Sequence, residues 1–427
     1  MKKIIPALIA IFMFCGAASA LDPLTWQDCV EIVMEHNPDL RSAEQNLSSS
    51  EYLADAAYSG FLPQVTANLS YNRGNRATFQ GSSGGAGATQ DGNISSSRYS
   101  TSLSVTENIF SGFQDMGKVK QGRANKDVSK ASLDATKVQV SFDLKSSFAG
   151  LLYAQDYEKL TREIIKRRED NASLVELRFE GGIENRGNLL LSKAFLSQAK
   201  FDNIVAKHSV DVSREKLAKV LGHDDAERIR ITGTVPIEEH KKAPDFKQIV
   251  LETPDHRQAE ARERSMMAGV TIARSQFFPS VNLVGSVSRQ GSSWDQNNNS
   301  VGANLSLPIF DGANNYFNFK SSQAGSAAAS WSKESVDRQT LPKLKEAYKI
   351  FVESLEKLKV DRDFLEAATV RAEISRNKYN NGLLSFEDFD SIENDLITKQ
   401  KTVLQSERDV ILAEAAWQQA KGKGIIP

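Results

Sequence analysis

The sequence has little of what defines several common protein classes. Its 427 residues include only 2 Cys and 11 Pro, and so few cysteines exclude a disulfide scaffold. Neither charge sign is in excess, with 53 Lys+Arg against 54 Asp+Glu, which argues against a nucleic-acid binder. Beyond the N-terminal segment, no apolar run is long enough for a membrane-spanning helix. The apolar share of 40% is too high for a disordered chain.

The first 20 residues are predicted to be a secretory signal peptide. Lys2 and Lys3 precede a short apolar run over 4–14, and Ala18-Ser19-Ala20 has the small-x-small pattern of a cleavage site. The apolar run itself is too short to cross a bilayer as a helix. The mature chain is therefore expected to begin at residue 21.

The rest of the chain consists of two copies of one sequence repeat. Two motifs of the first half recur at an offset of 216, namely Asn37-Pro38-Asp39-Leu40 as Thr253-Pro254-Asp255-His256, and Gly60-Phe61-Leu62-Pro63 as Phe277-Phe278-Pro279. Downstream the offset is 200, matching Asn108-Ile109-Phe110-Ser111-Gly112 with Pro308-Ile309-Phe310-Asp311-Gly312, and Arg178-Phe179-Glu180-Gly181-Gly182 with Lys378-Tyr379-Asn380-Asn381-Gly382. Chance does not account for separate motifs that keep a fixed register.

Each repeat contains two segments of alternating apolar and polar residues. In the first repeat these are 64–73 and 98–106, and in the second they include Val281, Leu283 and Val287, followed by 301–307. A period of two indicates strands with one apolar and one polar face. Such hairpins suit either a half-buried sheet in a soluble domain or a transmembrane hairpin whose apolar face meets lipid.

Long helices are predicted after each strand pair. The segments 113–178, 183–221, 313–379 and 383–421 contain few helix breakers, although Pro342 is expected to kink the third. At 1.5 Å per residue the first would span about 100 Å. Helices of this length predict a coiled coil, a bundle or a tube. The polar stretch 223–248 between the repeats is interpreted as an irregular linker.

No sequence motif predicts an enzyme, a metal site or a bound cofactor. Residues 112–119 are close to a phosphate-binding loop, but Val119 stands where that motif needs Ser or Thr to hold Mg²⁺. The five histidines do not have metal-ligand spacing. Cys29, the cysteine left after cleavage, is interpreted as a small buried apolar residue.

The doubled motifs resemble the TolC family of outer-membrane efflux and secretion channels. The residues that carry the resemblance run through the mature chain: Leu24-Thr25-Trp26, Asn37-Pro38-Asp39-Leu40, Gly60-Phe61-Leu62-Pro63, Leu221-Gly222, Pro308-Ile309-Phe310-Asp311-Gly312, and two turns of the form Arg/Lys-Phe/Tyr-x-x-Gly. The resemblance implies a mainly α protein with a β-hairpin membrane part. Three two-repeat protomers would form a 12-stranded β-barrel and a long α-helical barrel. One chain supplies four strands, too few to close a membrane barrel, so three copies would give 3 × 4 = 12.

The implied function is a passive outer-membrane exit duct for tripartite efflux or type I secretion, extending into the periplasm. The implied partners are two further copies of the chain, a periplasmic adaptor, an inner-membrane pump or ABC transporter, and outer-membrane lipid, with no cofactor and no nucleic acid. The sequence leaves open whether the cargo is a drug, a metal or a protein. The competing hypothesis is a secreted coiled-coil rod or adhesin, which explains the helices but not the alternating strands.

The expected division follows the repeats. It comprises the signal peptide 1–20, periplasmic helices 21–61, a β-hairpin 62–110, a long helical hairpin 111–222, a linker or equatorial segment with a helix 223–278, a second β-hairpin 279–310, a second long helical hairpin 311–422, and a tail 423–427. We expect the loops 74–97 and 290–299 to be extracellular. The residues expected to face lipid are Leu69, Tyr71, Leu103, Leu283 and Leu305.

The resemblance also implies a constriction of the pore at the two helix turns, whose tips are Gly182 and Gly382. By position, Asp388 matches an acidic pore residue of the family, and Glu387 and Asp390 would add charge. In the first turn Asn188 stands where the family often has Asp, and in the second Leu384 replaces a gating arginine. The alternative is that the three acids only solvate the start of a helix and favour its dipole.

Overall fold

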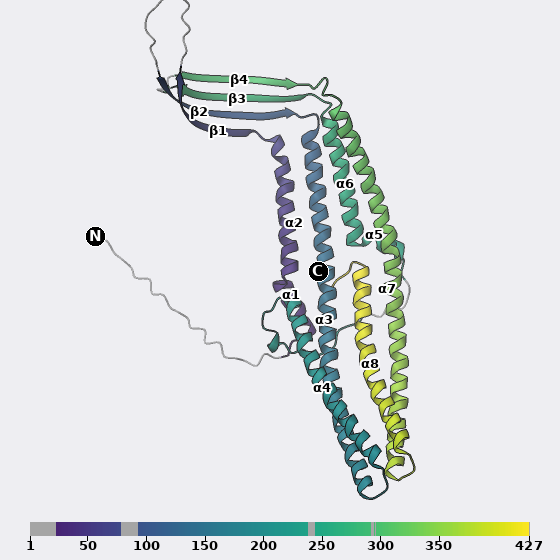
Figure 1. The fold of residues 1–427 in the computed structure, drawn as a ribbon. Coiled ribbons are helices and arrows are strands. Elements are labelled where there is room, and N and C mark those ends of the chain that lie inside the picture. The colour runs from purple at the N-terminus through teal and green to yellow at the C-terminus, as the bar shows by residue number, and fades with distance from the viewer. Residues whose placement is uncertain (1–22, 78–92, 238–243, 292–293, 295, 427) are drawn as a thin grey trace, which may run out of the picture. The chain divides into compact units, whose positions relative to one another are not determined.

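The computed structural model describes residues 23–77, 93–237, 244–291, 294 and 296–426. In chain order its elements are α1 (Trp26–His36), α2 (Pro38–Ala56), η1 (Ala57–Phe61), β1 (Gln64–Ala77), β2 (Asn93–Phe110), α3 (Gln114–Glu180), α4 (Arg186–Leu221), η2 (Ala226–Arg228), α5 (Phe246–Glu252), α6 (Pro254–Ser275), β3 (Ser280–Gly291), β4 (Gln296–Ser306), α7 (Asn314–Asn380) and α8 (Phe386–Ala420). The fold is mainly helical with one small antiparallel sheet, which confirms that part of the expected fold class (Figure 1).

The long helices α3, α4, α7 and α8 begin and end within three residues of the bounds expected from sequence. Each is long because few residues interrupt its backbone hydrogen bonds, and α7 continues through Pro342. A proline there removes one backbone donor but does not end this helix. No helix in the described ranges is both long enough and apolar enough to span a membrane.

The four strands form one sheet in the order β1-β2-β3-β4, with every neighbouring pair antiparallel. The two repeats meet at the β2–β3 pair, where Leu103 is opposite Val287. The register places all five residues expected to face lipid on one face, and all five side chains are exposed. The opposite face is mostly Ser, Thr, Asn and Gln, and its exceptions include Arg98 and Val284.

The strands are longer than the alternation indicated. β1 continues to Ala77 and β2 begins at Asn93, so the expected loop 74–97 is wrong at both ends. The expected loop 290–299 is also too long, because β3 ends at Gly291 and β4 begins at Gln296. Asparagine favours turns and is depleted in strands, but pairing with β3 holds Asn297–Asn299 extended. Residues 78–92 lie outside the described residues.

Backbone conformation repeats at the offset of 200 that relates the two halves. Left-handed φ angles recur at the matched positions Gly112 and Gly312, Phe113 and Ala313, Gly182 and Gly382, and Gly222 and Gly422. A Cβ on Gly222 would lie 2.4 Å from the carbonyl oxygen of His36, and one on Gly422 would lie 2.2 Å from Cδ of Pro254. Glycine is therefore required at both places for conformation and for space.

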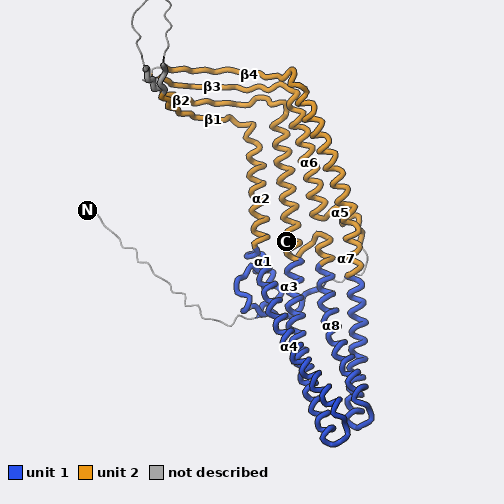
Figure 2. Tube along the Cα trace, viewed as in Figure 1, with its two compact units in different colours: residues 1–37, 142–239, 351–415 blue, residues 38–141, 240–350, 416–427 orange. Residues whose placement is uncertain are grey.

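The chain divides into two compact units, shown separately coloured in Figure 2. Unit 1 contains residues 1–37, 142–239 and 351–415, and unit 2 contains 38–141, 240–350 and 416–427. Unit 2 contains the sheet, with α2, α6 and parts of α3 and α7. Unit 1 contains two helical hairpins, one formed by α3 and α4 and the other by α7 and α8.

The core of unit 1 follows the seam read from the α3 sequence. Leu144, Phe148 and Leu151 are fully buried, at spacings of three and four residues. Cys29 of α1 is also fully buried, and burial, with a smaller effect of Asp28, raises the pKa of its thiol to about 12. It is thus the small buried residue that the sequence suggested.

The segment after α4 is more than a solvated linker. Its apolar side chains Ile229, Ile231 and Val235 are buried within unit 1. Leu24 pairs with Ile231 in a parallel β-bridge, which ties the beginning of the described chain to this segment. The expected irregular linker is irregular in backbone, but it packs as part of unit 1 because these apolar residues leave water.

Candidate functional site

The ends of the two helical hairpins in unit 1 have the same backbone. In the first turn the amide of Gly182 donates to the carbonyl of Phe179 (3.0 Å) and that of Ile183 to Arg178 (2.9 Å). In the second turn Gly382 donates to Tyr379 (3.0 Å) and Leu383 to Lys378 (2.9 Å). Both turns are Schellman motifs with a glycine at φ +73°.

The helix that follows each turn has a side-chain cap. Asn185 accepts a hydrogen bond from the amide of Asn188 (2.9 Å) at the start of α4. Ser385 accepts one from the amide of Asp388 (3.0 Å), and its hydroxyl donates to the Asp388 carboxylate (3.0 Å). Asp388 therefore contributes to the start of α8 through Ser385, and its side chain is exposed.

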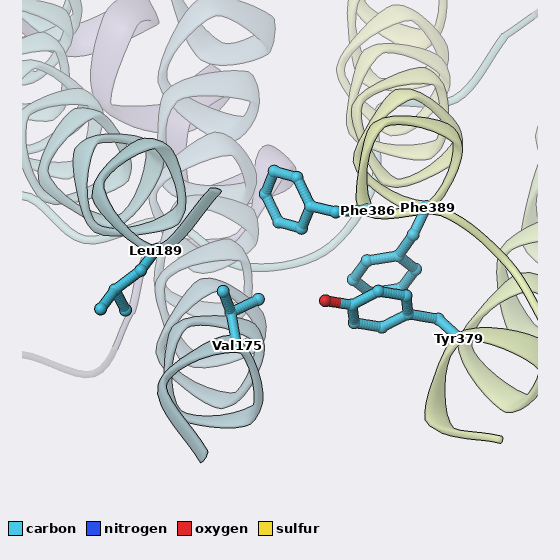
Figure 3. Packing of buried hydrophobic residues seen from close by; sticks show 5 residues of the cluster. All are labelled: Val175, Leu189, Tyr379, Phe386 and Phe389. Carbon is cyan, nitrogen blue, oxygen red and sulfur yellow. The ribbon is translucent and has the colours of Figure 1, made fainter. Parts of the chain in front are cut away.

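An aromatic cluster joins the two hairpins behind the turns. Its buried members come from all four helices and are Val175, Leu189, Tyr379, Phe386 and Phe389 (Figure 3). The rings of Tyr379 and Phe389 stack in parallel, with centroids 4.5 Å apart and planes 2° apart. Leu384, which the resemblance matches by position to a gating arginine, is partly buried and packs against this cluster. It contributes apolar contact and supplies no charge.

Polar contacts connect the same turns. The Tyr379 hydroxyl donates to the Glu184 carboxylate (3.0 Å), and the Arg178 guanidinium donates to the Tyr379 carbonyl (2.9 Å) and lies 4.6 Å from its ring centre. Burial and then the bond to Glu184 raise the pKa of the Tyr379 phenol. The phenol therefore stays protonated near neutral pH and serves as a donor.

The second contact between the turns involves the predicted residue Asn188. Its side-chain amide lies 2.8 Å from a carboxylate oxygen of Glu184 and 3.5 Å from one of Glu387. An aspartate at this position would add a third carboxylate beside these two. Asparagine instead supplies donors, so it reduces the repulsion between Glu184 and Glu387.

The third predicted acid, Asp390, is in a different environment from Asp388. It forms an ion pair with Arg168 at 2.7 Å, in which the side chains are 13% and 7% exposed. Arg168 also donates to Asn394 and lies over the ring of Phe195. The charge of Asp390 is thus balanced within the protomer, which leaves Glu387 and Asp388 as the exposed acids among the three.

The sequence did not predict that Arg178, Glu184 and Tyr379 would form the polar contacts between the two turns. Arg178 and Tyr379 belong to the duplicated turn motif, so their positions were visible. Glu184 gave no signal, because its partner is 195 residues away in the other repeat. Among the described residues, no group of three His, Cys, Asp or Glu could hold a metal ion.

A family model described as outer membrane efflux protein matches residues 30–223 and 246–423. Nodulation protein T of Rhizobium leguminosarum bv. trifolii is 23% identical over 307 residues, which cover 66% of this chain and 61% of that protein. Toxin and drug export protein A of Aggregatibacter actinomycetemcomitans is 20% identical over 395 residues, covering 91% and 84%.

The fold is similar to solved structures as well. The Campylobacter jejuni CmeC outer membrane channel matches with a TM-score of 0.81 and 15% identity, covering 93% of this chain and 85% of that one. At this identity the likeness concerns the fold alone. Measured against the nodulation proteins, the chain spans 61% of the relative's length.

Proposed function

Because this chain belongs to the outer membrane efflux protein family, we propose that it forms the exit duct of a tripartite efflux or type I secretion system. Members of the family are passive channel proteins rather than enzymes. The observation that carries the proposal is the four-stranded sheet: its apolar face is exposed, and among the described strands each edge strand has one neighbour.

The edges of the sheet favour closure by several copies. β1 and β4 each have one hydrogen-bonded neighbour among the described strands. Because four alternating strands place β1 and β4 antiparallel to one another, β4 of one copy continues the pattern against β1 of the next. In a membrane an open edge leaves backbone groups unpaired, so three copies would close a barrel of 3 × 4 = 12 strands.

The uncovered face favours contact with lipid. Leu69 is 77% exposed and Leu305 is 68% exposed, although both belong to a face built of apolar side chains. Exposed apolar strands in water would promote aggregation. The same face is suited to the hydrocarbon of an outer membrane, and the opposite, polar face would then line the lumen. A coiled-coil rod or adhesin, the competing hypothesis, gives no role to such a sheet.

The helical part also offers surfaces for neighbouring copies. On α4, the exposed residues Leu190, Phe201 and Val212 are spaced by eleven, which is three helical turns. In unit 1, a groove of about 680 Å³ between α7 and α8 has Ile374, Leu384 and Ile392 in its lining. We propose that neighbouring protomers cover these surfaces in the trimer, since large exposed apolar patches mark interfaces.

The helix turns would gate the duct from the periplasmic side. Glu387 and Asp388 of three copies would form rings of carboxylates, which favour cations and bind multivalent ones that block a narrow pore. The Tyr379–Glu184 bond and the Arg178 contacts would hold the two hairpins of each copy together. Opening would require these contacts to loosen when a periplasmic adaptor binds. An inner-membrane pump or ABC transporter would supply the energy.

The proposal is tested by the mass and conductance of the detergent-solubilised protein. We expect a trimer that inserts into planar bilayers and conducts, with block by trivalent cations from the side of the turns. A stable monomer, or a trimer without conductance, would overturn the duct. Leu69→Cys and Ser70→Cys form a matched spin-label pair, because adjacent strand residues face opposite sides. We expect the first label to report lipid and the second to report water.

A further inference from the structure

A second aromatic cluster, separate from the one between the helical hairpins, lies on the apolar face of the sheet toward its loop end. Tyr71 and Tyr99 are directly opposite in the β1–β2 ladder, with ring centres 4.9 Å apart. Trp294, in the β3–β4 connection, stacks on Tyr99 at 5.7 Å with the planes 21° apart. Three rings from two hairpins thus form one continuous surface.

Two arginines lie beside these rings on the same face. Arg73 is two residues beyond Tyr71 on β1, and Arg289 is two residues before Gly291, which is opposite Tyr99. The Nε of Arg289 donates to the Trp294 carbonyl (2.8 Å), which holds its guanidinium near the cluster. Both arginine side chains are exposed, and neither forms an ion pair with a carboxylate within the part of the chain described here.

The remaining apolar face has no basic residue along the described strands. Its other charged side chain is Glu107, which is opposite Leu283 near the helix end of the sheet. A second aromatic contact, between Phe110 and Phe113, marks that end. Tyr99 and Phe110 are 11 residues apart on β2, or about 37 Å along the strand. At the usual strand tilt this corresponds to about 28 Å of height, which is close to the thickness of a bilayer's hydrocarbon.

Resting on the proposed outer-membrane placement, we propose that Arg73 and Arg289, with Tyr71, Tyr99 and Trp294, bind the phosphate-bearing headgroup of a lipid in the outer leaflet. The guanidinium group is planar and donates two parallel hydrogen bonds to phosphate. Aromatic rings are favoured at the boundary between headgroups and hydrocarbon. The cluster supplies both at the depth where such a headgroup lies.

Charge complementarity selects this occupant over a neutral lipid. Each copy places two positive charges on the outward face on either side of the rings, Arg73 at the register of Ser97 and Arg289 at that of Thr101, and three copies would place six around the barrel. A headgroup without net charge would gain little from them, whereas a glycolipid with two phosphates would offer a phosphate to each arginine. The outer end of the sheet would therefore recognise a lipid headgroup, in addition to its role in placing the barrel in the membrane.

The experiment uses the purified full-length trimer and native mass spectrometry with lipid A, in its diphosphorylated and dephosphorylated forms. We expect the wild type to bind the diphosphorylated form preferentially. Arg73→Gln and Arg289→Gln should each weaken binding roughly 5-fold, and the double variant about 25-fold. The matched control is Arg98→Gln, because Arg98 adjoins Tyr99 on the same strand and lies on the opposite face. Its lipid binding should equal that of wild type.

The outcomes separate this inference from the duct itself. Equal binding of both lipid forms, or no loss in the double variant, would overturn the headgroup site; the spin label at Leu69 would still test the barrel. Loss in Arg98→Gln alone would show that the opposite face meets lipid, which would overturn both. Trimer mass and bilayer conductance of each variant confirm that the protein compared is folded.

Discussion

The two helical hairpins of unit 1 have the same backbone and different side-chain environments. Both turns are Schellman motifs with a glycine at φ +73°, and the two glycines, Gly182 and Gly382, are 200 residues apart. Yet Tyr379 is fully buried in the aromatic cluster, whereas its counterpart Phe179 is 37% exposed. The two copies thus share the turn, but one supplies the anchoring ring, Tyr379, and the other supplies Glu184, the acid that accepts its hydrogen bond.

Each hairpin contains one ion pair at matched positions, but the positive and negative side chains are exchanged between its two helices. In the first hairpin Lys193 pairs with Glu176 at 2.7 Å, and at the matched positions of the second Glu393 pairs with Arg376 at 2.8 Å. Both members of the first pair are about half exposed, but Glu393 is only 1% exposed. The geometry of the pair is thus independent of which helix carries the positive charge, while its energetic importance depends on burial.

The largest difference between the hairpins is expected for removal of the ring. Tyr379→Ala deletes a buried aromatic stacked on Phe389 and should lower the free energy of unfolding by about 3–5 kcal/mol. Phe179→Ala, at the matched position, should lower it by less than about 1 kcal/mol because that ring is partly solvated. Urea unfolding of the detergent-solubilised protein measures both. If both variants lost similar unfolding free energy, burial of Tyr379 in the cluster would not make the second turn more stable than the first.

The exchanged ion pairs give the next largest contrast. Arg376→Gln leaves the buried Glu393 without its ion-pair partner and should lower the free energy of unfolding by about 2–3 kcal/mol. The loss is smaller than for a fully buried ion pair, because Arg376 itself is partly exposed. Glu176→Gln in the exposed pair should change stability by less than about 1 kcal/mol. Thermal unfolding of the two variants is the measurement, and a larger effect of Glu176→Gln would contradict the assignment.

The two acids on α8 should separate stability from pore electrostatics. Asp390→Asn removes the charge that balances the buried Arg168 and should cost about 1–3 kcal/mol, with little change in ion selectivity. Asp388→Asn should cost less than about 1 kcal/mol but reduce cation selectivity and block by trivalent cations. Single-channel recordings of both variants decide this. Unchanged selectivity in Asp388→Asn would leave that residue as a helix-start residue only.

The smallest effect is expected for the hydroxyl of Tyr379. Tyr379→Phe keeps the stacked ring and should lose about 1 kcal/mol at neutral pH. Because burial and Glu184 raise the pKa of this phenol, the folded protein holds the proton more tightly than the unfolded chain, whose tyrosine has a pKa of about 10. This contribution is therefore complete below about pH 10 and falls as pH rises further. The phenylalanine variant should show a weaker fall in that range.

Much of the architecture could be predicted because it depends on local periodicity. The repeat offset, the four long helices and the four strands all follow from residue spacing, and α7 continues through Pro342 as one helix, as its predicted bounds required. Strand ends were less predictable. Asn297–Asn299 read as a loop in sequence, but the ladder to β3 supplies partners for their backbone groups. Pairing between distant segments overrides a weak local preference.

The candidate site was only partly predictable. Its glycine tips could be located from the duplicated turn motif, and its exposed acids, Glu387 and Asp388, from the family resemblance. Their role in a pore stays a prediction. Asp390 looked equivalent to its neighbours in sequence, and only the position of Arg168 shows that its charge is balanced. Glu184 could not have been chosen, since nothing near it in sequence indicates a tyrosine partner.

The sequence by itself determined the duplication, the lengths of the helices and the alternation of the strands, because each depends on side chains a few residues apart. Only the tertiary structure decided that the strands of both repeats join in one sheet through β2 and β3. It also decided that Tyr379, rather than Phe179, is the buried ring between the hairpins. These outcomes depend on which distant surfaces meet, and burial and hydrogen-bond satisfaction across a packed interface are properties that no local pattern encodes.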